Sequence, residues 1–166
     1  MQLVIRMPQG IRSRPAPMDK IDRMILRLLQ HDASLSVGDI ADRVSISKSA
    51  CWRRIQNLEK DGIILQRVAL LDQVSIGLPL TVYVQLRTNQ HNDAWVERFR
   101  TVTENIGGVL EVYRMSGDLD YLIKAVVKDM AGYDELYKEL IKADLFDVSA
   151  SFVMETLKST TEMPLV

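Results

Sequence analysis

The stretch that decides the fold of the first part of the chain is LSVGDIADRVSISKSACWRRIQNLEKDGI, residues 35–63. Apolar residues at positions 37, 40, 41 and 44 keep the i, i+3, i+4, i+7 spacing of one helix face, and Ser36 stands at the N-cap position. Ser45 and Ile46 form a turn, after which Ser47 caps a second helix. The inner side of that helix carries Cys51, Ile55 and Leu58. The stretch therefore predicts a helix-turn-helix.

The outer side of the second helix has the chemistry needed to bind DNA. The major groove admits one α-helix, and short polar side chains and Arg read base edges there. The residues expected to reach bases are Ser47, Lys48, Ser49 and Arg53 in the first two turns, with Gln56 on the same side. Those expected to contact phosphates are Arg54, Lys60 and the helix start capped by Ser36. The alternative is a helical domain whose charged outer faces are merely solvated.

Two further residues of this helix allow two interpretations each. Trp52 either contacts a DNA sugar or thymine methyl group, or packs under the helix. Cys51 is the single cysteine of the chain, so no internal disulfide can form. Because Cys51 lies on the inner side of the helix, a packing role is expected rather than a redox or metal-binding one.

The charge of the chain is split between its two halves. The net charge is −1, yet residues 1–78 hold twelve Lys and Arg against eight Asp and Glu, and residues 79–166 hold nine against fourteen. DNA affinity depends on phosphates neutralised locally, not on total charge. The basic half is the helix-turn-helix half, so a nearly neutral chain can still bind double-stranded DNA.

The first 17 residues predict a flexible basic tail, with three Arg, three Pro and no acidic residue. It is an alternative start, an expression remnant or an arm that contacts the DNA backbone. Asp19 is the expected N-cap of a first helix that completes a three-helix unit. The chain shows no apolar run long enough to span a bilayer and no cleavable leader, so a cytoplasmic, nucleoid-associated protein is expected.

Beyond Gly62 the pattern changes from helical to alternating. A β-branched, apolar run followed by turn residues predicts a strand-like hinge. The expected elements after it are strands at 80–87, 109–115, 120–127 and 148–157, and helices at 92–104 and 130–143. This βαββαβ order predicts a ferredoxin-like sheet with both helices on one face. The uncovered face is expected to carry apolar residues and to be covered by a second copy.

The predicted fold class is therefore α+β, with a three-helix, winged-helix-like N-terminal domain and a ferredoxin-like C-terminal domain. The expected parts are a tail at 1–17, the helix-turn-helix domain at 18–63, the hinge at 64–78 and an effector-binding and oligomerisation domain at 79–166.

Two motifs in this order resemble the leucine-responsive regulatory protein family, also called Lrp/AsnC or feast/famine regulators. They are SKSACWRRIQNLEKDGII at 47–64 and GDLDY at 117–121. The resemblance runs from about Met18 onward and implies a sequence-specific transcriptional regulator that senses amino acids. It implies dimers assembled into octamers or other rings, with a small amino acid bound between subunits. The region from Thr88 to Phe99 and the ending at 159–161 resemble members that respond to cysteine.

The family's effector positions map onto a loop, a helix start and the last strand. They are Gly117, Asp118, Asp120 and Tyr121, then Met130, then Ser151, Phe152 and Val153. An amino-acid ligand needs a carboxylate for its ammonium group, backbone N–H groups for its carboxylate and an apolar wall for its side chain. The alternative is that Gly117-Asp118 is only a hairpin turn, capped by Asp120, with Tyr121 in the core.

Other chemistry is not expected. His31 and His91 lie far apart and have no partners at metal-ligand spacing, and the sequence holds neither a phosphate-binding glycine loop nor a nucleophile elbow. We therefore expect that the protein binds no metal and no cofactor and is not an enzyme. Two alternatives stay open: a winged-helix regulator whose C-terminal domain only oligomerises, and a dimeric ferredoxin-like small-molecule enzyme.

Overall fold

The computed structural model of the chain describes residues 18–165, so the predicted basic tail at 1–17 lies outside the described residues. These residues divide into two compact units. One unit comprises residues 71–157, and the other comprises residues 18–70 together with 158–165. The structure thus groups the last segment with the helix-turn-helix, whereas the sequence assigned all of 79–166 to the second domain.

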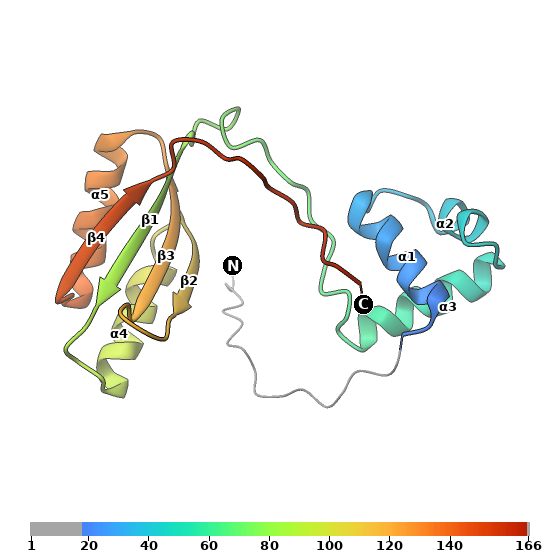
Figure 1. Ribbon diagram of the computed structural model, residues 1–166, viewed down its shortest axis with the longest axis horizontal. Coiled ribbons are helices and arrows are strands. Elements are labelled where there is room, and N and C mark those ends of the chain that lie inside the picture. The colour runs from blue at the N-terminus through green and yellow to red at the C-terminus, as the bar shows by residue number, and fades with distance from the viewer. Residues whose placement is uncertain (1–17, 166) are drawn as a thin grey trace. The chain divides into compact units, whose positions relative to one another are not determined.

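The first unit contains three helices: α1 (Lys20–His31), α2 (Val37–Arg43) and α3 (Lys48–Lys60) (Figure 1). Each begins at a side-chain cap, because Asp19, Ser36 and Ser47 each accept the backbone N–H three residues further on. The apolar stripes of the three helices meet in one core of Ile25, Leu26, Ile40, Ala41, Val44, Cys51, Ile55 and Leu58. The predicted helix-turn-helix and the packing role of Cys51 are confirmed.

A shared guanidinium ties α3 to the start of α1. Arg54 Nη1 donates to Asp19 Oδ2 at 2.7 Å and to Asp22 Oδ1 at 2.8 Å. The hydrogen bonds to these carboxylates raise the pKa of Arg54. The pKa of the Asp19 carboxyl lies below its ordinary 3.8, first because it accepts the Asp22 backbone N–H and then because Arg54 is beside it.

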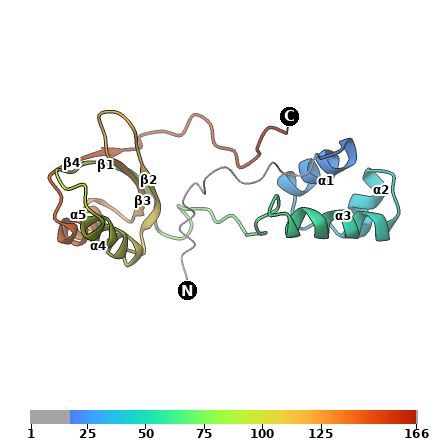
Figure 2. The ribbon, with the colours of Figure 1, turned by 90° about the horizontal axis from the view of Figure 1, so that it is seen from below.

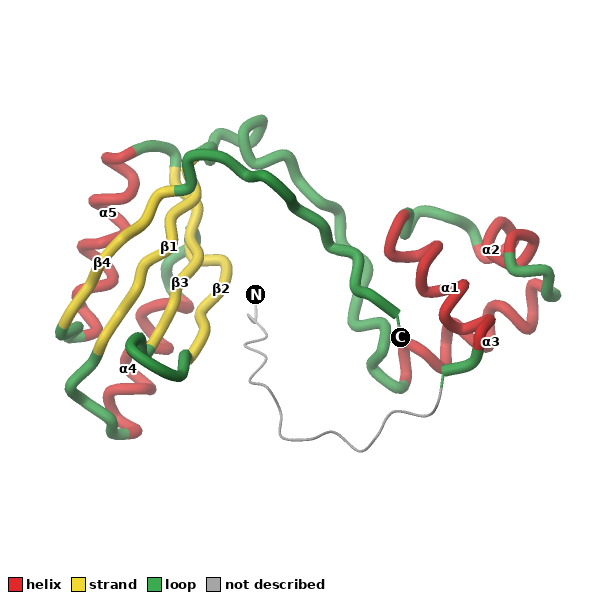
Figure 3. The backbone as a smooth tube through the Cα atoms, in the orientation of Figure 1, coloured by secondary structure: helices red, strands yellow, loops and turns green. Residues whose placement is uncertain are grey.

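The hinge after α3 has no regular secondary structure (Figure 3). The strand-like hinge expected from the sequence joins no sheet, because no described segment pairs with its backbone. Many of its apolar side chains face solvent instead, namely Leu65, Val68, Leu70, Leu71, Val74 and Ile76.

The second unit has the predicted βαββαβ order. Its elements are β1 (Leu80–Arg87), α4 (Asp93–Glu104), β2 (Val109–Arg114), β3 (Tyr121–Val127), α5 (Met130–Leu140), the short helix η1 (Ile141–Ala143) and β4 (Asp147–Phe152). All strand pairs are antiparallel, in the order β2-β3-β1-β4. Both α4 and α5 lie on one side of the sheet (Figure 2). This is the ferredoxin-like arrangement predicted from the sequence.

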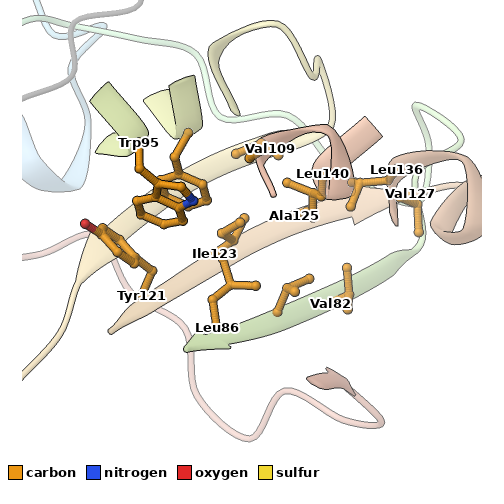
Figure 4. Close-up of a cluster of buried hydrophobic side chains, with 13 residues drawn as sticks. Val82, Leu86, Trp95, Val109, Tyr121, Ile123, Ala125, Val127, Leu136 and Leu140 are labelled. Atoms are coloured by element: carbon orange, nitrogen blue, oxygen red, sulfur yellow. The ribbon is translucent and has the colours of Figure 1, made fainter. Parts of the chain in front are cut away.

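The core of this unit fills the space between the sheet and its two helices (Figure 4). Alternate residues of β1 and β3 point into it, as the period of a strand requires. Trp95 is 1% exposed, stacks on Phe99 with ring centroids 5.2 Å apart, and donates its indole N–H to the Asp144 carbonyl at 3.0 Å. Tyr121 tilts against both rings, so the aromatic side chains pack α4 onto the start of β3.

The opposite face of the sheet carries polar residues together with apolar ones such as Leu122 and Tyr113, which pair across β2 and β3, as expected from the sequence. Lys124 Nζ lies 3.0 Å from Glu111 Oε1. Ser149 Oγ donates to Gln85 Oε1 at 3.2 Å. Strand alternation places these residues opposite the core because the core takes the odd positions of β3 and the even positions of β1.

Ser45 joins α2 to α3 with a φ of 57°, in the left-handed region that favours glycine. We expect Ser45→Gly to raise the free energy of unfolding by about 0.5–1 kcal/mol, because it relieves this strain. Ala33→Gly is the matched control: Ala33 lies in the turn after α1 without a positive φ, so it should lose stability instead. Thermal and urea unfolding measure both. Equal destabilisation by the two changes would contradict the prediction.

Protonation of Asp19 at acid pH should lower the stability of the three-helix unit. A carboxyl whose pKa is lowered on folding stabilises the fold above 3.8, its unfolded value, and loses that contribution as the pH falls through the folded pKa. Asn caps helices as well as Asp, so Asp19→Asn removes the charge and keeps the cap. We expect its Tm to lie a few degrees below that of the unchanged chain at pH 7 and the two values to converge near pH 2. Circular dichroism measures both Tm values across this pH range. A constant difference between them would contradict the prediction.

Candidate DNA-binding surface and effector loop

The outer side of α3 presents a continuous polar surface, and we call its members the α3 face. These exposed residues are Lys48, Ser49, Trp52, Arg53, Gln56 and Lys60. They are exposed because burial of Cys51, Ile55 and Leu58 fixes the rotation of the helix about its axis. Trp52 is 57% exposed and therefore does not pack under the helix, while its contact with DNA stays a prediction.

Arg54 does not belong to this face. Its side chain is 31% exposed, and its guanidinium lies between two carboxylates of the α1 start. A charge compensated in this way has little left to neutralise a phosphate. The structure gives Arg54 a role in joining α1 to α3, in place of the phosphate contact expected from the sequence.

Two of the three serines of the predicted DNA-binding site, Ser36 and Ser47, cap helices. Ser36 Oγ donates to Asp39 Oδ2 at 2.6 Å and accepts the Asp39 backbone N–H at 3.1 Å. Ser47 Oγ accepts the Ala50 N–H at 3.2 Å. These serines thus aim the backbone of α2 and α3, and their hydroxyls are already engaged.

A glycine that sequence reasoning missed shapes the junction of α2 and α3. A Cβ on Gly38 would lie 3.1 Å from Cε and 3.2 Å from Nζ of Lys48. The Lys48 ammonium therefore rests against the first turn of α2, beside the Ser36 cap. The signal for this packing is a small residue one turn into a short helix, which has no meaning until the two helices are placed together.

The loop between β2 and β3 is built around Asp120. Its carboxylate Oδ2 accepts the Thr88 N–H at 2.8 Å, and its backbone N–H donates to the Leu86 carbonyl at 3.0 Å. Gly117 has a φ of +105°, which only glycine adopts without strain, and Asp118 is exposed. The loop thus offers an exposed glycine turn beside a half-buried carboxylate.

Thr88, Gln90 and Asp144 extend this loop into a network that the sequence did not reveal. Thr88 Oγ1 accepts the Gln90 N–H at 3.0 Å, and Gln90 Nε2 donates to Asp144 Oδ2 at 2.7 Å. The Asp144 carbonyl in turn holds the indole of Trp95. The Asp120 carboxylate is therefore linked through hydrogen bonds to the start of α4.

The predicted effector residues fall into two groups at opposite ends of the sheet. Tyr121 pairs with Leu86, whereas Phe152 pairs with Val82. Four residues of an extended strand separate these positions, a distance of about 13 Å. Gly117, Asp118, Asp120 and Tyr121 form the first group; Met130, Ser151, Phe152 and Val153 belong to the second.

Within these groups the side chains point in different directions. Tyr121 is buried among the aromatic rings of the core, and Phe152 meets Tyr133 edge to face at 5.0 Å. Ser151 is exposed on the face of the sheet opposite the helices, and Met130 is 58% exposed at the start of α5. One copy of the chain thus brings the loop residues together but does not unite the two groups.

Other kinds of site were sought among residues 18–165. No group of three or more His, Cys, Asp or Glu in this range could hold a metal ion. No helix in the same range is long and apolar enough to cross a membrane.

Comparisons with known proteins agree with these two units. Residues 18–64 match the winged helix-turn-helix DNA-binding family, and residues 81–163 match the Lrp/AsnC ligand binding domain. The DNA-binding transcriptional activator DecR of Escherichia coli strain K12 is 45% identical over 150 residues, which cover 89% of this chain and 99% of that protein.

Solved structures show the same similarity. An AsnC family transcriptional regulator from Agrobacterium tumefaciens matches with a TM-score of 0.84 and 51% identity, covering 89% of this chain and 97% of that one. A transcriptional regulator from Neisseria meningitidis, solved as an L-Met complex, matches with a TM-score of 0.84, 30% identity and the same coverage. These proteins are regulators and not enzymes. The chain belongs to the Lrp/AsnC family of DNA-binding transcriptional regulators.

Proposed function

We propose that this regulator places the α3 face of two copies into successive major grooves of one DNA site, and that a small amino acid bound between copies modulates this binding. The observation that carries the proposal is that one chain has both an exposed α3 face and an effector loop whose partner residues lie at the far end of the sheet. DNA is its macromolecular partner, so its place of action is the nucleoid.

The division of the effector residues favours a site made by two chains. The loop around Asp120 supplies a carboxylate and a glycine turn, which suit the ammonium and carboxylate groups of an amino acid. The second group lies about 13 Å away in the same chain, too far to wall the same small ligand. A neighbouring copy can bring its own Met130 and the end of its β4 to this loop.

The hinge supports assembly of copies. Its exposed apolar side chains include Leu70 at 73% and Leu71 at 70%, and its backbone lacks a ladder partner among the described residues. Another hinge paired with it would bury these side chains and satisfy the backbone groups. The face of the sheet opposite the helices offers a second surface for contact between copies, one in which water can bridge polar groups.

The chemical class of the effector is drawn from the family. The Neisseria relative binds L-Met, and a Zymomonas mobilis relative that is 45% identical to this chain is a glutamate uptake regulatory protein. We propose an amino acid as the ligand here. A thermal-shift screen with all twenty amino acids identifies it, because a ligand of the folded state raises the Tm by mass action. If no amino acid shifts the Tm and none is detected by calorimetry, the C-terminal unit serves only assembly.

Arg53 and Arg54 test the DNA-binding face as a matched pair. Arg53 forms no ion pair among residues 18–165 and is exposed, so Arg53→Ala should leave the Tm unchanged. It should weaken binding to a selected DNA site by about 1–3 kcal/mol and relax preference at one base position. Arg54→Ala should lower the Tm by about 4–8 °C and leave the affinity of the folded protein unchanged.

Fluorescence anisotropy on selected and random DNA, at several salt concentrations, measures both variants. Equal losses on selected and random DNA after Arg53→Ala would show that Arg53 contacts phosphate only. If Arg54→Ala reduced the dependence of affinity on salt concentration, Arg54 would contact a phosphate, contrary to what its two ion pairs indicate.

Asp120 tests the effector loop in the same manner, with Glu104 as the matched position outside it. Asp120→Asn keeps an oxygen to accept the Thr88 N–H and removes the negative charge, so the fold and DNA binding without effector should not change. The amino acid identified by the thermal-shift screen should lose at least about tenfold in affinity, since a charge-assisted hydrogen bond is removed. Glu104→Gln is the control, because it removes one exposed carboxylate at the end of α4, outside the proposed effector positions. A full response to the amino acid in Asp120→Asn, measured by calorimetry, would refute the site.

A further inference from the structure

The segment after β4 packs against the helix-turn-helix unit through the end of α1. Gln30 Nε2 donates to the Met163 carbonyl at 3.2 Å, and the Met163 N–H donates to Gln30 Oε1 at 2.5 Å. The side-chain amide of Gln30 thus pairs with the backbone of residue 163 as a neighbouring strand would. His31 Nδ1 lies 3.3 Å from Glu162 Oε1, next to this pair.

Apolar contacts accompany these hydrogen bonds. Leu165 packs against the core of the three-helix unit. Residues 161, 163 and 165 form one wall of a groove of about 620 Å³, whose other walls are the end of α1 and residues 63–70. Leu26 and Leu29 lie on the α1 side of this groove. The segment therefore covers apolar surface that would otherwise face water.

The same segment is the direct continuation of β4. Val153 still donates its N–H to the Thr81 carbonyl at 3.0 Å, so the sheet ends at this residue. Met154 and Leu157 are 94% and 89% exposed, which shows that the connecting residues pack on neither core. A short stretch of chain thus links the end of β4 to a segment seated on α1.

We propose that residues 158–165 form a strap that docks against the end of α1 in its own chain's helix-turn-helix unit, so that the chain connects the two units both by the hinge and by the strap. A few contacts suffice, because tethering gives the strap a millimolar effective concentration. Because the strap continues from β4 and contacts α1, it connects the end of β4 to α1. This part rests on the proposed function, since Ser151, Phe152 and Val153 at the end of β4 are among the proposed effector positions.

Hydrogen exchange of the full chain, followed by mass spectrometry, tests docking without any effector. The Met163 amide should exchange at least about tenfold more slowly than in an unstructured peptide. Gln30→Ala and Leu165→Asp should each remove this protection and leave exchange in α3 unchanged. Gln56→Ala is the control, because Gln56 lies on α3 and bonds Glu59 instead of the strap.

Two results would overturn docking. One is exchange of the strap at the unstructured rate in the unchanged chain, or protection that survives Gln30→Ala. The other is protection that rises with protein concentration, which would place the strap in a different copy. Protection that is constant on dilution supports docking within one chain.

A chain that stops after Leu157 tests the link to regulation. It should bind selected DNA without effector as the full chain does, and the amino acid found by the thermal-shift screen should change that binding several-fold less. An undiminished response would refute the path through the strap. If the full chain itself responds to no amino acid, the proposed function fails while the exchange result still decides docking.

Discussion

The burial of Cys51, Ile55 and Leu58 along one side of α3 is the constraint on which the rest of the DNA-binding unit depends. These side chains are between 0% and 4% exposed, so α3 has one allowed rotation against α1 and α2. Each step along a helix turns by about 100°, and neighbouring residues therefore meet different surroundings. Arg53 faces solvent, whereas Arg54, one position later, faces the start of α1 and finds two carboxylates there.

A similar logic governs the second unit, where a strand reverses its facing at every residue. Tyr121 and Asp120 are adjacent, yet the ring joins the aromatic core and the carboxylate turns toward the Thr88 N–H. An aromatic ring committed to the core is not available to a ligand. The carboxylate, by contrast, keeps the capacity to accept further hydrogen bonds, because an ionised carboxylate has about four acceptor positions.

Local patterns predicted most of the fold. Caps at Ser36 and Ser47, the terminator Gly62 and the alternation of β1 were sufficient to place those elements within a residue or two. The last strand was placed less well: it was expected at 148–157, whereas β4 ends at Phe152, after which no described strand pairs with the chain beyond Val153. The hinge, expected to be strand-like, joins no sheet because a strand needs a partner, and periodicity shows only that a segment is able to pair.

The candidate sites were predicted less completely, for a physical reason. The type of a residue suggests which group its side chain could bind. Which partners engage that side chain depends on neighbours that are distant in sequence. Asp19 lies 35 residues from Arg54, and Thr88 lies 32 residues from Asp120. Gly38 beneath Lys48 and Gln30 against Met163 are further examples, since each acquires its meaning only when two segments are brought together.

The position of the strap also has a consequence for how the protein is made. A ribosome adds roughly 5–20 residues each second, so the groove formed by α1 and residues 63–70 is complete roughly 5–20 s before residues 158–165 are synthesised. During that interval the nascent helix-turn-helix unit exposes an apolar surface that its own chain cannot yet cover.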